Sequence, residues 1–236
     1  MNKFWEEDLP VGYYDKILTK GLKNKKGIQA NWHNLTFVEV AEFFDNTNKH
    51  LDYACGPGTF IGNYLNCDSI GIDVSDEQID YAKKKYGDNF YTLEEFKVIP
   101  NSKKKFEIIT ILGLFEFLKD EEIDILINQL YGMLSEGGTL IFTTPNTQSS
   151  MKYLQKIISL FGPVDYRQQH INTQSVDKFY KMFKKSKFKI VEINKIHNIG
   201  IFFSFFSLNI GKKTNNFIKK IEILNNGFLI MGVLRK

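Results

Sequence analysis

A short glycine-containing segment between an apolar run and a helix-like run is where this sequence could hold a ligand. It reads Asp52-Tyr53-Ala54-Cys55-Gly56-Pro57-Gly58-Thr59, and Asp73 ends the next apolar run, 17 positions after Gly56. Glycines at a strand-to-helix turn let a ligand lie against the backbone and the helix N-terminus. An acidic side chain at the end of the adjacent strand can accept both hydroxyls of a ribose. The pattern therefore predicts a site for a nucleoside-bearing ligand.

Three details narrow the kind of nucleoside. The dinucleotide fingerprint needs a third glycine where this chain has Ile61, and the Gly-Lys-Ser/Thr of a phosphate-binding loop is absent. Asp52, just before the turn, would repel a pyrophosphate but would accept a hydrogen bond from a cationic amino group. These observations favour an adenosine that carries an amino acid and no phosphates.

With these motifs the sequence resembles the class I S-adenosylmethionine-dependent methyltransferases, of the small-molecule type. The glycine turn matches the family's first motif, with Ala54 in place of a common glycine, and Asp73-Val74 matches the second. The run 111–118 resembles the segment after the fourth strand, and 134–140 with Thr144-Pro145-Asn146 resembles the fifth-strand motif. The resemblance extends in order and spacing over about residues 50–236.

The resemblance implies S-adenosyl-L-methionine as the cofactor and predicts which residues bind it. The acid of the second motif would hold the ribose, Val74 would lie against the adenine, and the backbone at Leu112 and Gly113 would approach the methionine part. Tyr14 would close over the cofactor. The expected cofactor-binding residues are Asp52, Ala54, Cys55, Gly56, Gly58, Thr59, Asp73, Val74, Leu112, Gly113 and Tyr14.

The expected reaction is methyl transfer by in-line displacement to a small-molecule acceptor, at an oxygen nucleophile. A hydroxyl acceptor needs a base, and histidine is the usual choice near neutral pH. The candidates are His170, between the fifth strand and the next helix, and His33, beside Trp32. The alternatives are loop ordering for His170 and a helix anchor for His33. Two other functions stay open: an RNA methyltransferase that uses the basic C-terminal part, and a non-catalytic partner protein that binds the cofactor.

From residue 50 onward, short apolar strands alternate with amphipathic helices, which is typical of a mostly parallel sheet covered on both faces. We expect a Rossmann-like three-layer α/β/α sandwich with seven strands, the last one antiparallel, in a single domain over 1–236. A helical cap should occupy 1–47, the core 48–236, and acceptor-side insertions should lie near 146–172 and 197–226. The expected helices are 11–20, 31–44, one from 75, 120–134, 148–160 and 173–186, and the expected strands are 51–55, 69–74, 90–93, 106–112, 139–143, 188–193 and 227–234.

The composition excludes several classes of protein. Two cysteines among 236 residues cannot make a disulfide-rich scaffold or a cysteine-based zinc site, so no metal is expected. No signal peptide or transmembrane run is apparent, which predicts a cytoplasmic location. Residues 1–165 carry 17 basic and 24 acidic side chains, a net charge of −7, and residues 166–236 carry 14 and 3, a net charge of +11.

The basic C-terminal part, residues 166–236, suggests an anionic or lipid-linked acceptor. The simpler interpretation of these lysines is a solvated face without a binding role. Lysine dominates over arginine, which makes nucleic-acid binding a weak expectation. The apolar run 199–210, followed by lysines, suggests contact with a membrane surface, the lining of an apolar acceptor pocket or an insertion packed on the sheet. The sequence makes no prediction of the oligomeric state.

Overall fold

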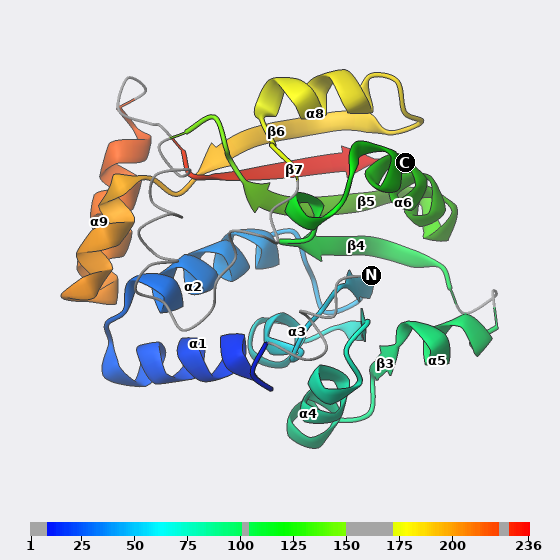
Figure 1. The fold of residues 1–236 in the computed structure, drawn as a ribbon, viewed down its shortest axis with the longest axis horizontal. Helices are drawn as coiled ribbons and strands as arrows, with labels where there is room; N and C mark the ends of the chain where they lie inside the picture. Colours follow the sequence, from blue (N-terminus) through cyan, green and yellow to red (C-terminus); the bar gives the residue numbers. More distant parts are fainter. Residues whose placement is uncertain (1–8, 101–103, 150–171, 222–226) are drawn as a thin grey trace. The chain divides into compact units, whose positions relative to one another are not determined.

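A computed structural model describes residues 9–100, 104–149, 172–221 and 227–236 of the chain. Its strands form a seven-stranded sheet in the order β3-β2-β1-β4-β5-β7-β6 (Figure 1). Neighbours in this sheet pair in parallel, as β2 does with β3 and β4 with β5, except that β7 is antiparallel to both β5 and β6. The predicted α/β fold, with its antiparallel last strand, is confirmed.

Helices and strands alternate along the chain as the apolar pattern predicts. The elements in order are α1 (Tyr13–Asn24), α2 (Ile28–Ala41), β1 (Lys49–Tyr53), α3 (Thr59–Tyr64), β2 (Asp68–Asp73), α4 (Asp76–Tyr86), β3 (Phe90–Thr92), α5 (Leu93–Val98), β4 (Phe106–Leu112), the 3-10 helix η3 (Phe115–Phe117), α6 (Asp120–Met133), β5 (Leu134–Pro145), α8 (Val176–Phe183), β6 (Lys189–Ile196), the 3-10 helix η4 (Ile199–Phe205), α9 (Leu208–Lys219) and β7 (Leu229–Arg235).

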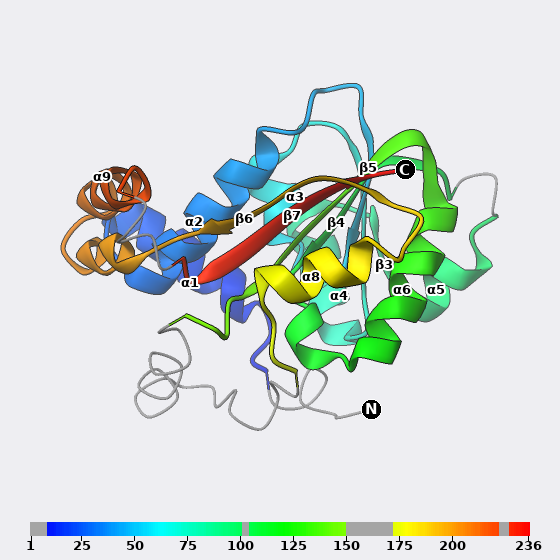
Figure 2. The ribbon, with the colours of Figure 1, turned by 90° about the horizontal axis from the view of Figure 1, so that it is seen from above.

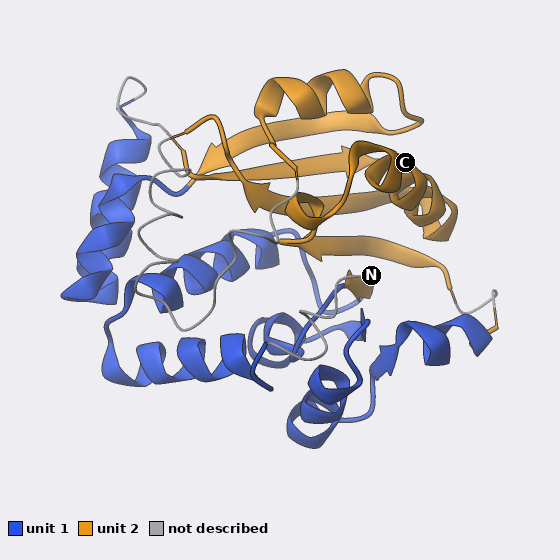
Figure 3. Ribbon diagram, in the orientation of Figure 1, with its two compact units in different colours: residues 1–48, 54–98, 197–226 blue, residues 49–53, 99–196, 227–236 orange. Residues whose placement is uncertain are grey.

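The chain divides into two compact units, which are coloured separately in Figure 3. Unit 1 comprises residues 1–48, 54–98 and 197–226, and unit 2 comprises 49–53, 99–196 and 227–236. The single domain expected over 1–236 stays a prediction. Each unit has buried apolar side chains of its own, as the next two paragraphs describe.

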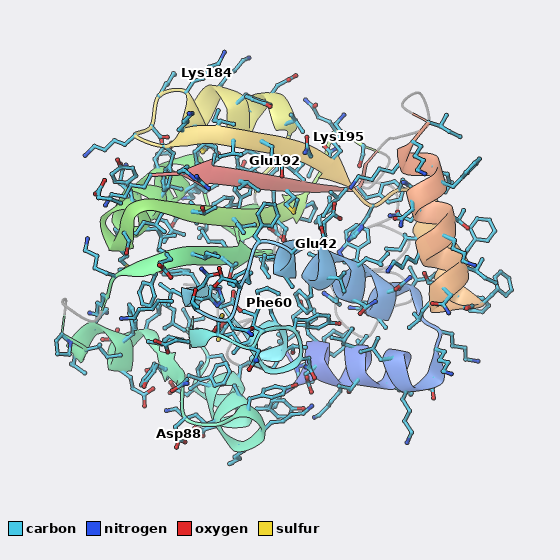
Figure 4. All side chains as sticks on the ribbon, turned by 180° about the vertical axis from the view of Figure 1, so that it is seen from behind. Glu42, Phe60, Asp88, Lys184, Glu192 and Lys195 are labelled. Carbon is cyan, nitrogen blue, oxygen red and sulfur yellow. The ribbon has the colours of Figure 1, made fainter. Side chains whose placement is uncertain are left out.

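In unit 1, helices α3 and α4 pack around the short strands β2 and β3. Cys55, Ile79, Ala82 and Phe90 form a buried cluster there. Phe60 of α3, labelled in Figure 4, contacts the rings of Phe37, Phe44 and Tyr64 and so links α3 to α2 and the loop that follows it. The N-terminal helices of unit 1 therefore join its strand–helix part through aromatic packing.

In unit 2, helices α6 and α8 lie on one side of the strands (Figure 2). Phe179 and Phe183 of α8 pack on Phe142 of β5, with ring centroids 4.8 and 5.4 Å apart. Strand β6 ends the sheet order and carries Glu192 and Lys195, both labelled in Figure 4. Charged side chains on an edge strand discourage pairing with another chain.

Three local expectations need correction. The fifth strand is longer than 139–143, because it begins at Leu134 and includes the Gly137-Gly138 turn region. Helix α5 follows the third strand directly and was not predicted, and neither was α9 between the last two strands. Gln78 of α4 contacts the N-terminal segment, since its Oε1 accepts from Gly12 N–H at 3.0 Å.

Other expectations are confirmed or lie beyond the described residues. Ser75 caps α4, since its side chain accepts from the N–H of Gln78. The helix expected at 148–160 falls mainly on residues outside the described part, as does most of the 146–172 insertion. Among the described residues, no helix is long and apolar enough to cross a membrane.

The N-terminal cap and the 197–226 insertion come together in unit 1. Asn31 of α2 donates from Nδ2 to Ser204 Oγ at 2.7 Å and to the carbonyl of Leu208 at 3.1 Å. Thr36 Oγ1 lies 2.7 Å from Nε2 of the buried His197. The insertion, which we considered as packed on the sheet, is thus held by the N-terminal helices through a buried polar network.

Candidate functional site

The glycine turn of unit 1 is joined to the end of β2 by a buried carboxylate. Asp73 Oδ2 accepts a hydrogen bond from the backbone N–H of Gly56 at 2.8 Å, and Oδ1 accepts from Ser75 N–H at 3.0 Å. Asp73 is 9 % exposed. Burial raises the pKa of Asp73, while the backbone hydrogen bonds act in the opposite direction. These two hydrogen bonds therefore hold the carboxylate in one orientation at the turn. Binding of a ribose by this carboxylate stays a prediction.

Backbone geometry explains the glycines of the turn. Gly56 and Gly58 have φ values of +53° and +72°, a region that L side chains rarely adopt. A Cβ on Gly58 would also lie 2.6 Å from the ring of Phe90, so the close packing of α3 on β3 requires a glycine there. A Cβ on Gly56 would meet none of the described residues within 4 Å, so they leave space beside its backbone.

Ala54, which replaces a glycine common in the family, adopts a left-handed conformation with φ +62°. An alanine in this region is strained by contact between its Cβ and the following carbonyl. The turn keeps its geometry all the same, since Cys55 N–H donates to Ile72 O at 2.9 Å and Gly58 N–H to Cys55 O at 3.1 Å. Ala54 is therefore held by the turn in a backbone conformation that is strained for an L-residue.

Two further features of unit 1 fit a bound nucleoside. The hydroxyl of Thr59, at the start of α3, is buried and has no hydrogen-bond partner among the described residues. A cavity of about 270 Å³ is lined by Val74, Ser75, Asp76 and Glu77, directly after Asp73. An unpartnered buried hydroxyl and a hollow beside the carboxylate are what a polar ligand with a flat apolar part would fill.

Asp52 belongs to unit 2 and is held by a neighbouring strand. Its Oδ1 accepts a hydrogen bond from Thr110 Oγ1 at 2.6 Å, and Thr110 Oγ1 lies 2.8 Å from His50 Nε2. Burial lowers the pKa of His50 to about 3, so the ring is neutral. Because the single Thr110 proton goes to Asp52, the neutral His50 donates its Nε2–H to the Thr110 oxygen. This chain of bonds orients the carboxylate, and it gives His50 a structural role.

The segment after β4 contains a buried carboxyl group in unit 2. Glu116 Oε2 accepts from Thr144 Oγ1 at 2.9 Å, and burial raises the pKa of Glu116 to about 7. Gly113, with φ +81°, donates its N–H to Thr143 O at 2.9 Å. The end of β5 therefore holds the loop that includes Leu112 and Gly113.

A second contact fixes the same loop from the C-terminal side. Gln174 Nε2 donates to Phe115 O at 3.0 Å, and Asn172 N–H donates to Glu116 O at 3.3 Å. The amide oxygens of Gln174 and Asn146 are buried without a partner among the described residues. In the described part of unit 2, these are two unpaired hydrogen-bond acceptors near the end of β5.

The two histidines predicted for catalysis have different outcomes. His170 lies outside the described residues. His33 lies in an aromatic cluster of unit 1, with its ring centroid 5.3 Å from that of Tyr14 and 6.0 Å from that of Phe37. Burial lowers the pKa of His33 to about 4, which makes it a weak base. The structure therefore places the rings of Tyr14 and His33 in contact. The aromatic surroundings of His33 equally suit a histidine that only packs in the core.

Sequence reasoning missed Thr110 and assigned no role to Glu116 or Thr144. A signal existed for Thr110, because it is a polar residue within the apolar run Ile108-Ile109-Thr110-Ile111 of a buried strand. No comparable signal identifies Glu116, whose partner is 28 residues away.

The comparisons with known proteins agree with this fold and with these motifs. A family model described as a methyltransferase domain matches residues 25–193. Because the model covers more than half of the chain, the chain belongs to this methyltransferase domain family. S-adenosylmethionine is its cofactor.

Individual curated relatives match only part of this chain. Among them, the tRNA (guanine-N(7)-)-methyltransferase of Clostridium botulinum (strain Loch Maree / Type A3) is 37% identical over 109 residues, which cover 44% of this chain and 45% of that protein. The mRNA cap guanine-N(7) methyltransferase of Schizosaccharomyces pombe is 25% identical over 151 residues, which cover 54% of this chain and 41% of that protein. The malonyl-[acyl-carrier protein] O-methyltransferase 1 of Ilyobacter polytropus is 24% identical over 162 residues, which cover 64% and 59%. The chain thus spans about half the length of these curated relatives.

A solved structure shares the fold over nearly the whole chain. The plantazolicin methyltransferase BpumL, in complex with SAH, has a TM-score of 0.60 and 19% identity, with 99% of this chain and 93% of that chain covered. This likeness supports the Rossmann-like methyltransferase fold.

Proposed function

We propose that this protein transfers the methyl group of S-adenosylmethionine to an oxygen of a small-molecule acceptor. The observation that carries the cofactor part is the hydrogen bond from Gly56 N–H to the buried Asp73, beside the space at Gly56 and the cavity at Val74. The assignment of a small-molecule oxygen acceptor rests on the amide oxygens of Asn146 and Gln174 and on the kind of basic residues present, as described below.

The cofactor roles follow from the chemistry of each group. Asp73 accepts hydrogen bonds from the ribose hydroxyls, and Asp52 accepts from the ammonium of the methionine part, because a carboxylate suits each of these donors. Thr59 Oγ1 supplies a further polar contact, and Val74 packs against the adenine. Ala54, Cys55, Gly56, Gly58, Leu112 and Gly113 contribute backbone, and Tyr14 covers the cofactor.

When bound, S-adenosylmethionine supplies an electrophilic methyl carbon, so the protein has mainly to align the acceptor. The unpaired oxygens of Asn146 and Gln174 suit an acceptor that donates hydrogen bonds, as a hydroxyl group does. His170 or His33 would take the proton that the acceptor loses. Burial weakens His33 as a base.

A small-molecule acceptor is favoured over RNA by the kind of basic residues present. Only Arg167 and Arg235 are arginines, whereas surfaces that read bases use arginine heavily. By its name, the Ilyobacter relative methylates an oxygen of a carrier-bound small molecule. The yeast relative, which by its name acts on an mRNA cap, keeps RNA as the second candidate.

The experiment combines binding with transfer. The purified chain should bind S-adenosylhomocysteine in a calorimetric titration, and absence of binding would overturn the cofactor assignment. Methyl transfer from labelled S-adenosylmethionine is then measured against pools of hydroxyl, carboxyl and amine compounds and against total RNA. Label in RNA alone would reject the small-molecule proposal, and binding without any transfer would favour the non-catalytic partner protein.

A further inference from the structure

The 3-10 helix η4 and helix α9 expose many large apolar side chains within unit 1. The exposed fractions are 59 % for Ile199, 46 % for Phe203, 65 % for Phe205, 71 % for Phe206, 48 % for Ile210 and 64 % for Phe217. A single exposed apolar side chain is ordinary, but a group of them marks an interaction site. We call these six residues the η4–α9 surface.

The other side of this helix pair is occupied, so the exposed side chains cannot turn inward. A Cβ on Gly211 would lie 1.8 Å from Ser204 Oγ, and a Cβ on Gly200 would lie 2.5 Å from Asn215 N. The two helices therefore pack backbone to backbone through their glycines. Asn31 of α2 completes this buried side through its hydrogen bond to Ser204.

Apolar and cationic residues alternate along the outer face of α9. Ile210, Lys213, Phe217 and Lys220 follow one another at spacings of three or four, which places them on one stripe of the helix and its end. All four are exposed, whereas Gly211 and Asn215 on the opposite side are buried. The outer face of α9 is therefore apolar and positively charged together.

The loop between α1 and α2 adds lysines beside this surface. Leu208 N–H donates to Lys25 O at 2.9 Å, and Gly27 N–H donates to Ser204 O at 2.7 Å. These bonds join the loop to the junction of η4 and α9, next to Phe205 and Phe206. Lys25 and Lys26 of this loop are exposed, as is Lys23 in the last turn of α1. Figures 1 and 2 both show α2 beside α9.

Acidic residues are nearly absent from the two segments that build this region, 16–41 and 197–221. Their lysines are Lys16, Lys20, Lys23, Lys25, Lys26, Lys212, Lys213, Lys219 and Lys220, and their one acidic residue is Glu39. Glu39 forms an ion pair with Lys219 at 2.7 Å. Asp15, Glu42 and Glu222 lie one position outside these segments, so with them included nine lysines face four carboxylates and the region keeps a net positive charge.

We infer that the η4–α9 surface binds an anionic lipid bilayer, with its phenylalanines in the headgroup–acyl boundary and the surrounding lysines on lipid phosphates. Aromatic residues favour that boundary, and clustered lysines near it are attracted by anionic lipids. RNA fits less well, because the region has no arginine and its cations are all lysines. The inference does not depend on the proposed acceptor or on cofactor binding.

The test is co-sedimentation of the whole chain with vesicles of phosphatidylcholine alone or with about one third phosphatidylglycerol. We expect binding to the anionic vesicles and a steep loss of binding at about 0.5 M salt, where charges are screened. The double variant F205S/F206S should lower the partition coefficient about tenfold or more, and K212Q/K213Q should lower it on anionic vesicles.

Matched control variants distinguish vesicle binding by the η4–α9 surface from nonspecific binding by other exposed apolar or charged side chains. The variant I125S/V191S removes two apolar side chains of comparable exposure in unit 2, and K84Q/K184Q removes two exposed lysines elsewhere. Both should bind vesicles as the unchanged chain does. Absence of vesicle binding, equal loss in the controls, or tighter binding to a single-stranded RNA than to the vesicles would overturn the inference. Circular dichroism of each variant confirms that it is folded.

Discussion

The backbone N–H of Gly56 donates a hydrogen bond of 2.8 Å to Oδ2 of Asp73. The two residues lie on different elements, the turn after β1 and the end of β2, yet the bond makes the turn and the carboxylate one structural feature of unit 1. The backbone of the turn is therefore already ordered when a ligand binds the carboxylate. This lowers the entropic cost of binding.

Replacement of Asp73 should weaken cofactor binding. For D73A we expect the affinity for S-adenosylhomocysteine to fall by about 1–3 kcal/mol, or about 5- to 150-fold, since hydrogen bonds to a charged group are lost. Titration calorimetry measures the change. D80N, on the exposed side of α4, is the control and should bind normally. Unchanged affinity in D73A would reject the ribose role.

Replacement of Ala54 by glycine should relieve the strain of its positive φ. Left-handed backbone costs an L-residue about 1–2 kcal/mol, while glycine adds about 0.5–1 kcal/mol of unfolded-state entropy. We therefore expect A54G to leave the free energy of unfolding unchanged or to raise it by up to about 1.5 kcal/mol. A41G, at the end of α2, should lower it by about 1 kcal/mol. Urea denaturation measures the free energy of unfolding of both variants. Equal losses in A54G and A41G would contradict backbone strain at Ala54.

Removal of the Thr110 hydroxyl should disturb the carboxylate of Asp52. T110V keeps the shape of the side chain but removes the group that bonds Asp52 and His50, so we expect a loss of about 1–3 kcal/mol in unfolding free energy. T110S keeps the hydroxyl and should recover most of this loss. If Asp52 binds the cofactor, T110V also weakens S-adenosylhomocysteine binding more than T110S does. Equal stability of T110V and the unchanged chain would exclude a role for this hydrogen bond.

The buried Glu116 should make stability depend on pH. Its folded-state pKa is raised to about 7 from the usual 4.5, so the folded protein keeps this proton over a range where the unfolded chain has lost it. The free energy of unfolding should therefore fall as pH rises from about 4.5 to about 7, by about 3 kcal/mol from this group. E116Q cannot ionise and should lack this component.

The measurement compares E116Q with the unchanged chain by denaturation at several pH values. The variant should gain relative stability between about pH 4.5 and 7 and hold that gain at higher pH. The exposed-carboxylate control E121Q should give a small difference that changes little with pH. A pH-independent difference for E116Q would mean that Glu116 ionises normally in the folded state.

Local sequence patterns predict the order of the seven strands, the glycine turn and the acid at Asp73. These are local properties, because apolar periodicity selects helix or strand and positive φ angles select glycine within a few residues. The bounds of Phe106–Leu112 were predicted to the residue for this reason. The strand 134–145 was predicted too short, because glycines usually end a strand.

The tertiary structure decided which distant side chains meet. Thr110 reaches Asp52 across 58 residues because the register of β1 and β4 places them opposite each other. Glu116 reaches Thr144, and the insertion at 197–226 reaches the N-terminal helices, through packing that no local pattern encodes. Burial in the fold raises the pKa of Glu116. The packing of η4 on α9 leaves the phenylalanines of their outer face exposed. Such properties depend on long-range contacts, so they follow from the fold and not from any one segment.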